Sequence, residues 1–111
     1  MKGTYLGEFE ELVLLTVGIL QQEGAYGSNV LEEIEARTSR SVNLSAVHSA
    51  LQRLVDKRFL KREKGEATAV RGGKRKIYYQ LTTDGVQVIQ QVRELRDGLW
   101  QAIPNVVING K

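Results

Sequence analysis

Ser45, His48 and Ser49 are the residues of this sequence that most resemble a catalytic group. On a helix their spacing places them on one face, where the histidine could act as a general base for a serine hydroxyl. Hydrolysis would also need an acid to orient the histidine, a pocket and an oxyanion hole. No acidic residue lies between Glu35 and Asp56, and an exposed helical face supplies neither a pocket nor an oxyanion hole. We therefore do not expect an enzyme.

A basic run is the second group of residues whose types and spacing could serve a chemical function. Its sequence is Arg71-Gly72-Gly73-Lys74-Arg75-Lys76. Adjacent cations repel one another unless an anion neutralises them, and glycines let the backbone turn and approach a partner closely. The run lacks the spacing and the following helix of a phosphate-binding loop. It favours contact with a polyanion, although a solvated basic face is the simpler alternative.

The distribution of charge supports a polyanionic partner. The formal net charge is +3, but residues 41–81 hold ten basic and three acidic side chains, whereas residues 1–40 hold three basic and seven acidic ones. Such asymmetry within one small domain is typical of a face that meets nucleic acid.

Composition excludes several classes of protein. The chain has 111 residues, enough for one domain, and the 41% hydrophobic and 26% charged residues are typical of a globular protein. It has no cysteine and one histidine, so we expect no disulfide, no metal site and no cofactor. We also expect no membrane span and no signal peptide, and hence a cytoplasmic location.

Hydrophobic periodicity predicts three helices in the first half of the chain. The first covers residues 8–22, the second opens at residues 26–29 and closes at residues 37–41, and the third covers residues 43–57. Ser28 (or Gly27) is the expected N-cap of the second helix, and Asn43 that of the third. The polar face of the third helix suits close approach to a hydrogen-bonding surface, because it carries Ser45, His48, Ser49, Gln52 and Arg53.

A β-hairpin and a fourth helix follow. The strands are expected from residue 59 to 64 and from 74 to 81, with one of Tyr78 and Tyr79 packed inside and the other half-exposed. The fourth helix begins at Thr82 or Thr83, reaches about Pro104 and is followed by a short tail. Its apolar seam is too broad for the remaining core, so we expect it to meet a second copy of the chain. The predicted dimer interface comprises Leu12, Leu15, Val88, Val92, Leu95, Leu99, Trp100 and Ile103.

This order of elements predicts a winged helix-turn-helix protein, mostly α-helical with a small β-hairpin. Residues 1–81 would form the DNA-binding domain, residues 82–105 the dimerisation helix and residues 106–111 the tail, all in one compact unit. The third helix would enter the major groove and the hairpin would follow the backbone or the minor groove. The candidate DNA contacts are Tyr26, Ser28, Asn43, Ser45, His48, Ser49, Gln52, Arg53, Arg71, Lys74, Arg75 and Lys76. Arg53 has the alternative of pairing with Asp56 or Asp84.

The sequence resembles the PadR-like transcriptional regulators over roughly residues 5–90. The resemblance lies in the stretches LGEFEELVLL (6–15), AYG (25–27), LSAVHSALQRL (44–54) and, most specifically, RGGKRKIYYQLT (71–82). It implies a homodimer with a winged N-terminal domain and a dimerising C-terminal helix, usually acting as a repressor. The short C-terminus resembles the compact subgroup of the family.

One residue departs from the family pattern. His48 stands where the family commonly has a tyrosine that reaches the DNA backbone, and a histidine can also donate to a phosphate. Some relatives hold flat aromatic ligands between aromatic side chains at the dimer interface, which makes Trp100 a candidate ligand residue. A tryptophan packed in the dimer seam is the alternative.

We therefore predict a dimeric, sequence-specific regulator of double-stranded DNA, acting as a repressor and released by a small planar aromatic effector. The alternative is a winged-helix module whose basic face binds an acidic protein. Only the first requires preference for a duplex sequence.

Overall fold

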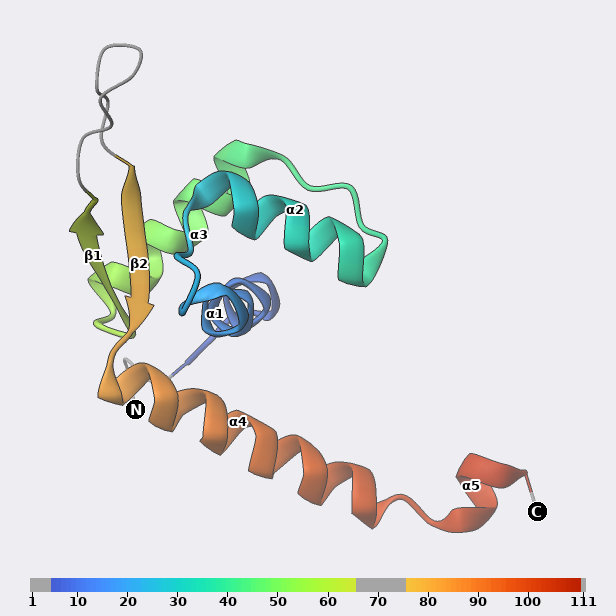
Figure 1. Cartoon of the computed structure of the whole chain (residues 1–111). Coiled ribbons are helices and arrows are strands. Elements are labelled where there is room, and N and C mark those ends of the chain that lie inside the picture. Colours follow the sequence, from blue (N-terminus) through green and yellow to red (C-terminus); the bar gives the residue numbers. More distant parts are fainter. Residues whose placement is uncertain (1–4, 66–75, 111) are drawn as a thin grey trace.

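A computed structural model describes residues 5–65 and 76–110 of the chain. Three helices come first, then a two-stranded hairpin, a long helix and a short one (Figure 1). Their bounds are Glu8–Leu20 (α1), Gly27–Thr38 (α2), Leu44–Asp56 (α3), Leu60–Lys64 (β1), Ile77–Leu81 (β2), Thr83–Ala102 (α4) and Asn105–Asn109 (α5). The predicted class, mostly helical with a small hairpin, is confirmed.

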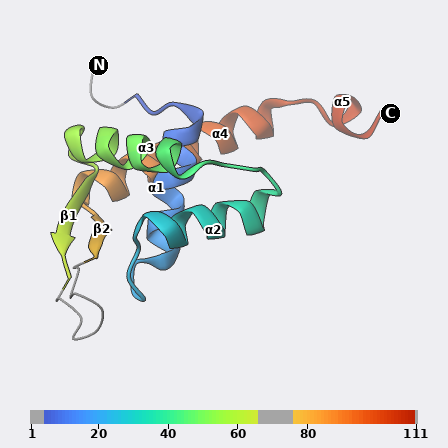
Figure 2. The same cartoon turned by 90° about the horizontal axis from the view of Figure 1, so that it is seen from above.

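The core lies where α1, α2 and α3 pack together, with the hairpin against one side (Figures 1 and 2). Each helix contributes an apolar stripe at helical spacing, and the side chains at its centre are fully buried. These are Val13, Leu14 and Val17 of α1, Val30 and Ile34 of α2, and Val47, Leu51 and Leu54 of α3. Because α3 buries this stripe, its opposite face is left to solvent.

Local hydrogen bonds set where the helices begin. Asn43 caps α3 as predicted, since its Oδ1 accepts from the backbone N–H of Ala46 at 2.8 Å. The predicted cap of α2 was wrong. This helix begins at Gly27, with Tyr26 as N-cap, and Asn29 Oδ1 accepts from the Tyr26 backbone N–H at 2.8 Å. Ser28 therefore lies inside the first turn of α2.

The hairpin is antiparallel and runs in register from Leu60 opposite Leu81 to Lys64 opposite Ile77. Both strands are shorter within the described residues than the sequence predicted, and residues 66–75 lie outside the described part. Tyr79 is buried and Tyr78 half-buried, as expected. The backbone N–H of Tyr79 donates to the Ala25 carbonyl at 2.9 Å, which joins the hairpin to the segment before α2.

Helix α4 starts against the body and then leaves it (Figures 1 and 2). Its first turn is capped by Thr82, whose Oγ1 accepts from the Gly85 backbone N–H at 2.9 Å. Gly85 lies so close to the Phe59 carbonyl that a Cβ there would meet its oxygen at 2.1 Å. The sequence predicted only a short tail after the fourth helix, but residues 105–109 form a further helix, α5, beyond the end of α4 (Figure 1). None of the helices described in the structure is long and apolar enough to cross a membrane.

Candidate nucleic-acid interface

The outward face of α3 carries the side chains that the sequence predicted. Ser45, His48, Ser49, Gln52 and Arg53 are all exposed, whereas Val47, Ala50, Leu51 and Leu54 on the opposite face are fully buried. The exposed row is uninterrupted by acidic side chains until Asp56, at the end of the helix. The structure therefore presents one continuous hydrogen-bonding face, which we call the α3 face and define by those five exposed residues.

A groove of about 400 Å³ adjoins the first turn of the α3 face. It brings together the N-terminus of α2, the start of α3 and strand β2. Its lining comprises Tyr26, Gly27, Ser28, Leu44, His48, Lys76, Ile77 and Tyr79. Four of the predicted DNA contacts thus share one hollow, although they are as many as 50 positions apart (Tyr26, Ser28, His48 and Lys76).

His48 and Lys76 each contact another residue of this groove. The His48 ring lies against Gly27, where an added Cβ would approach its Cε1 to 2.5 Å. Lys76 Nζ lies 4.0 Å from the centre of the Tyr26 ring, a distance at which a cation is attracted to the aromatic face. Tyr78 meets the same ring edge-on, with centroids 5.6 Å apart. Tyr26 is therefore a platform for a cation at the base of the wing.

Arg53 makes a contact that the sequence did not suggest. Its Nε donates to Glu10 Oε2 at 2.8 Å, so its partner is neither Asp56 nor Asp84. Lys57 Nζ donates to the other carboxylate oxygen at 2.6 Å. Burial favours a raised pKa for Glu10, but these two hydrogen bonds and one from the Gly7 backbone outweigh it and hold the pKa below its ordinary value.

Arg62 is a basic residue of the site that sequence reasoning missed. The hairpin register places Arg62 opposite Tyr79, on the face that packs toward the helices. Its guanidinium reaches across to α3, where Nη1 donates to Gln52 Oε1 at 2.8 Å. Strand alternation signals an inward-facing position, but only the tertiary structure shows that this position borders α3.

The remaining predicted cations are placed differently. Lys76 is described and exposed, whereas Arg71, Lys74 and Arg75 lie outside the described residues. On β1, Lys61, Arg62 and Lys64 are exposed and extend the positive charge along the hairpin. No group of three or more potential metal-binding side chains occurs in residues 5–65 and 76–110.

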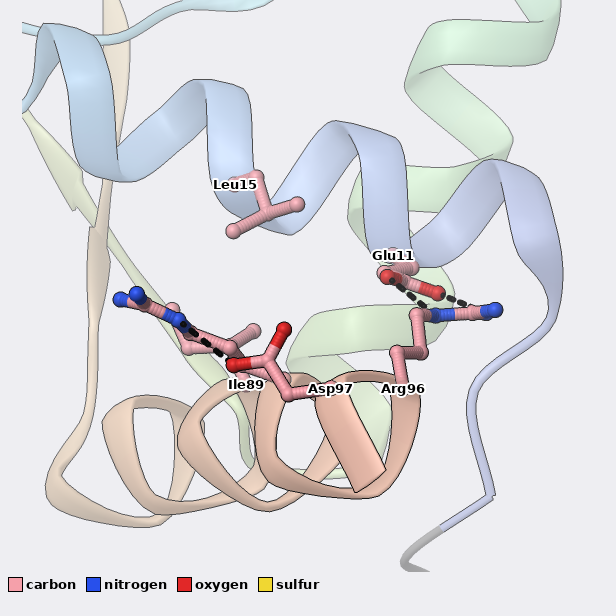
Figure 3. Close-up of a pocket in the computed structure, with 6 residues that line it drawn as sticks. Glu11, Leu15, Ile89, Arg96 and Asp97 are labelled. Atoms are coloured by element: carbon pink, nitrogen blue, oxygen red, sulfur yellow. Dashed lines mark hydrogen bonds and ion pairs between the residues drawn. The ribbon is translucent and has the colours of Figure 1, made fainter. Parts of the chain in front are cut away.

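A second exposed region lies on the side of the body where α1 meets α4. A groove of about 270 Å³ there is lined by Glu11, Leu15, Ile89, Arg93, Arg96 and Asp97 (Figure 3). Arg96 crosses from α4 to Glu11 on α1 with hydrogen bonds of 2.7 and 3.2 Å. The ion pair fastens the middle of α4 to the body, beside the exposed side chain of Leu15.

The predicted dimer seam divides into two parts. Val88 is buried in the core of its own chain, and Leu12 packs partly buried against that core. Leu95, Leu99 and Trp100 are more than 60% exposed. The exposed part of the predicted seam is therefore the second half of α4 together with Leu15 of α1, whereas Val92 and Ile103 are half-buried.

The arrangement of three helices, a polar third helix and a basic hairpin defines a winged helix-turn-helix protein. The family model described as "Transcriptional regulator PadR-like family" matches residues 16–91, and the chain belongs to this family. Its members are transcriptional regulators, so the chain is a regulator rather than an enzyme. The resemblance identified in the sequence is confirmed.

Solved structures share the fold. A PadR-like transcription factor from Bacteroides fragilis matches with a TM-score of 0.71 and 22% identity over 88% of each chain. A PadR-like regulator from Bacillus cereus matches with a TM-score of 0.65 and 17% identity, over 86% of this chain and 90% of that one. A PadR family regulator from Clostridium difficile matches with a TM-score of 0.59 and 23% identity, over 88% and 95%. No curated protein matches the sequence.

Proposed function

We propose that this transcriptional regulator is a dimeric repressor that binds a specific double-stranded DNA sequence. The observation that carries the proposal is the α3 face, whose exposed hydroxyl, imidazole and amide groups adjoin the groove that holds His48 and Lys76. A helix of this size fits the major groove, which is about 12 Å wide. The short polar side chains would then meet base edges while the cations of the hairpin meet phosphates.

Two residues of the groove suit the DNA backbone. His48 stands where its exposed ring can donate a hydrogen bond to a phosphate, and the first backbone N–H groups of α2 and α3 point out of their helix ends beside it. Lys76, on the Tyr26 ring, adds a positive charge at the same end of the interface. Lys74, Arg75 and Arg71, although outside the described residues, continue that charge in the sequence.

Dimerisation is the second part of the proposal. The exposed side chains of Leu95, Leu99 and Trp100 lie on the second half of α4, and Leu15 is exposed on α1, which faces that helix. Contiguous apolar surface of this kind is typical of an interface, and a second copy of the chain offers the same stripe to cover it. A dimer would present two α3 faces to two half-sites.

An effector is the third part. Trp100 is 61% exposed, so a planar aromatic molecule could stack on its ring in the seam between two copies. Binding there would change how two α4 helices pack and hence the distance between the two α3 faces. Candidate planar aromatics should quench the fluorescence of Trp100 and weaken DNA binding together. If they do neither, Trp100 serves only the dimer seam.

The decisive experiment is selection of duplexes from a random library, followed by binding of the enriched and scrambled duplexes at two or more salt concentrations. A palindromic motif bound well above the scrambled control is the expected result. Replacing Lys74, Arg75 and Lys76 by alanine should weaken binding to both duplexes and flatten the salt dependence by about one unit for each phosphate that is no longer neutralised. Weak, salt-sensitive binding without a motif would favour an acidic protein as the partner.

A further inference from the structure

Gln52 is held at both ends of its amide by charged side chains. Its Oε1 accepts from Arg62 Nη1 at 2.8 Å, and its Nε2 donates to Asp56 Oδ1 at 2.9 Å. The three residues come from the second half of α3 and from β1, and all three are exposed. They form a chain of two hydrogen bonds across the edge of the α3 face.

The two neighbours fix which way the amide points. A guanidinium can only donate and an ionised carboxylate can only accept, so the amide oxygen must face Arg62 and the amide nitrogen must face Asp56. Turning the amide over would place its nitrogen against a donor and its oxygen against an acceptor, and neither hydrogen bond could form. A solitary exposed glutamine has no such constraint.

The oxygen and the nitrogen of the fixed amide can each make one further hydrogen bond. The oxygen can accept two hydrogen bonds and accepts one from Arg62, while the nitrogen can donate two and donates one to Asp56. The amide oxygen can therefore accept one more hydrogen bond, and the amide nitrogen can donate one more. In the major groove, adenine presents the matching pair, an N6 donor beside the N7 acceptor, and a glutamine amide can bind both at once.

We propose that Gln52 reads an adenine in the major groove, and that Arg62 and Asp56 are positioning residues that orient its amide. The inference rests on the proposed DNA-binding function and adds to it the base that this part of the α3 face selects. Guanine offers two acceptors at this edge, so it would leave the amide oxygen of Gln52 facing another acceptor.

The experiment measures the binding of the enriched duplex and of each single base-pair change within it. The wild-type protein should discriminate for A·T at one position of each half-site by about 5- to 150-fold. Gln52→Ala should abolish discrimination at that position and leave the others unchanged. Asp56→Ala and Arg62→Met should each reduce it by about 2- to 12-fold, because the freed amide must lose its rotational freedom on binding.

A matched control distinguishes the loss of amide orientation at Gln52 from the loss of one positive charge on β1. Lys61 lies next to Arg62 on β1 and projects from the opposite face of the hairpin. Lys61→Met removes the same charge as Arg62→Met and should leave base preference unchanged. Gln52→Glu combined with Asp56→Ala should move the preference from A·T to C·G, because a carboxylate accepts from cytosine N4.

The outcomes distinguish this inference from the function on which it rests. Absence of any motif for the wild-type protein overturns the DNA-binding proposal and the inference with it. A motif whose base preferences all survive Gln52→Ala overturns the inference alone. A preference that disappears in Gln52→Ala but survives both Asp56→Ala and Arg62→Met removes the positioning role. So does a lower salt slope in Arg62→Met with unchanged base preference, which would assign Arg62 to a phosphate.

Discussion

The carboxylate of Glu10 and the guanidinium of Arg53 meet at 2.8 Å, although the two residues are 43 positions apart in the chain. The other carboxylate oxygen accepts from Lys57 at 2.6 Å and, at 3.2 Å, from the backbone N–H of Gly7. Glu10 therefore ties the start of α1 to the last turn and the C-cap of α3. This tie supports the helix that carries the α3 face.

Replacing Glu10 by glutamine should lower the free energy of unfolding by about 1–3 kcal/mol, because charge-assisted hydrogen bonds are removed from a buried group. The effect should depend on pH. The pKa of Glu10 is depressed in the folded protein, so its stabilisation is complete above the pKa of the unfolded state and is lost as the pH falls through the lower pKa of the folded state. Urea unfolding of wild type and Glu10→Gln at matched protein concentration should give curves that converge on acidification.

Glu8 provides the control for this measurement. It pairs with Arg40 at 2.7 Å, but its side chain is 70% exposed. Glu8→Gln should therefore change the unfolding free energy by at most about 1 kcal/mol. If Glu8→Gln and Glu10→Gln lower the free energy of unfolding equally, the contact between α1 and α3 stabilises the protein no more than an exposed ion pair does.

Gly27→Ala should weaken DNA binding through His48. The added methyl group would meet the imidazole ring at 2.5 Å, and the exposed ring can rotate away, so stability should change by less than about 1 kcal/mol. The displaced ring would then miss its phosphate. In a His48→Ala background, Gly27→Ala should have no further effect on affinity. If Gly27→Ala reduces affinity equally in the wild-type and His48→Ala backgrounds, its effect does not act through His48.

Two glycines of α4 should respond oppositely to alanine. Gly85→Ala places a methyl group 2.1 Å from the Phe59 carbonyl oxygen, which is backbone and has little room to move, whereas nothing lies within 4 Å of a Cβ at Gly98. Gly85→Ala should destabilise the protein by at least about 1–3 kcal/mol. Gly98→Ala should stabilise it by about 0.5–1 kcal/mol through helix propensity. Thermal unfolding of both variants checks the pair, and a neutral Gly85→Ala would contradict the close approach of α4 to Phe59.

Much of the fold could be predicted from local pattern. The helices α1, α2 and α3 bury apolar stripes that are visible as three- and four-residue spacings, and Asn43 is a strong capping residue in its own right. The short helix α5 was missed, although Pro104 before it and Gly110 after it (φ 72°) are recognisable start and stop signals. An interval of five residues is too short for hydrophobic periodicity to appear.

The rest of the site depends on contacts between distant residues. Nothing near Arg53 in sequence points to Glu10, and nothing near Gln52 points to Arg62, because each pair forms only after two separate elements have packed. The α2 cap was missed for a local reason: Asn29 reaches back to the Tyr26 backbone, so the capping group lies after the helix start. Sequence reasoning thus located the faces of the site but not the pairings that orient its side chains.

Leu95→Glu or Leu99→Glu should convert the proposed dimer to monomers. Both side chains are more than 60% exposed within one chain, so the substitutions leave the core intact, but in a dimer each would bury a charge in an apolar seam at the cost of several kcal/mol. Gln90→Glu, on the opposite side of the same helix and also exposed, introduces the same charge and should leave the dimer unchanged. Sedimentation velocity across a concentration series measures the association.

The DNA-binding consequence follows from the number of half-sites engaged. A monomer keeps one α3 face and should bind a palindromic duplex with the affinity of a single half-site, because a second, tethered half-site no longer adds to the affinity. Leu95→Glu should therefore lower affinity for the palindrome far more than for an isolated half-site. A dimer that survives both leucine substitutions would place the interface elsewhere on the molecule and leave the exposed half of α4 to another partner.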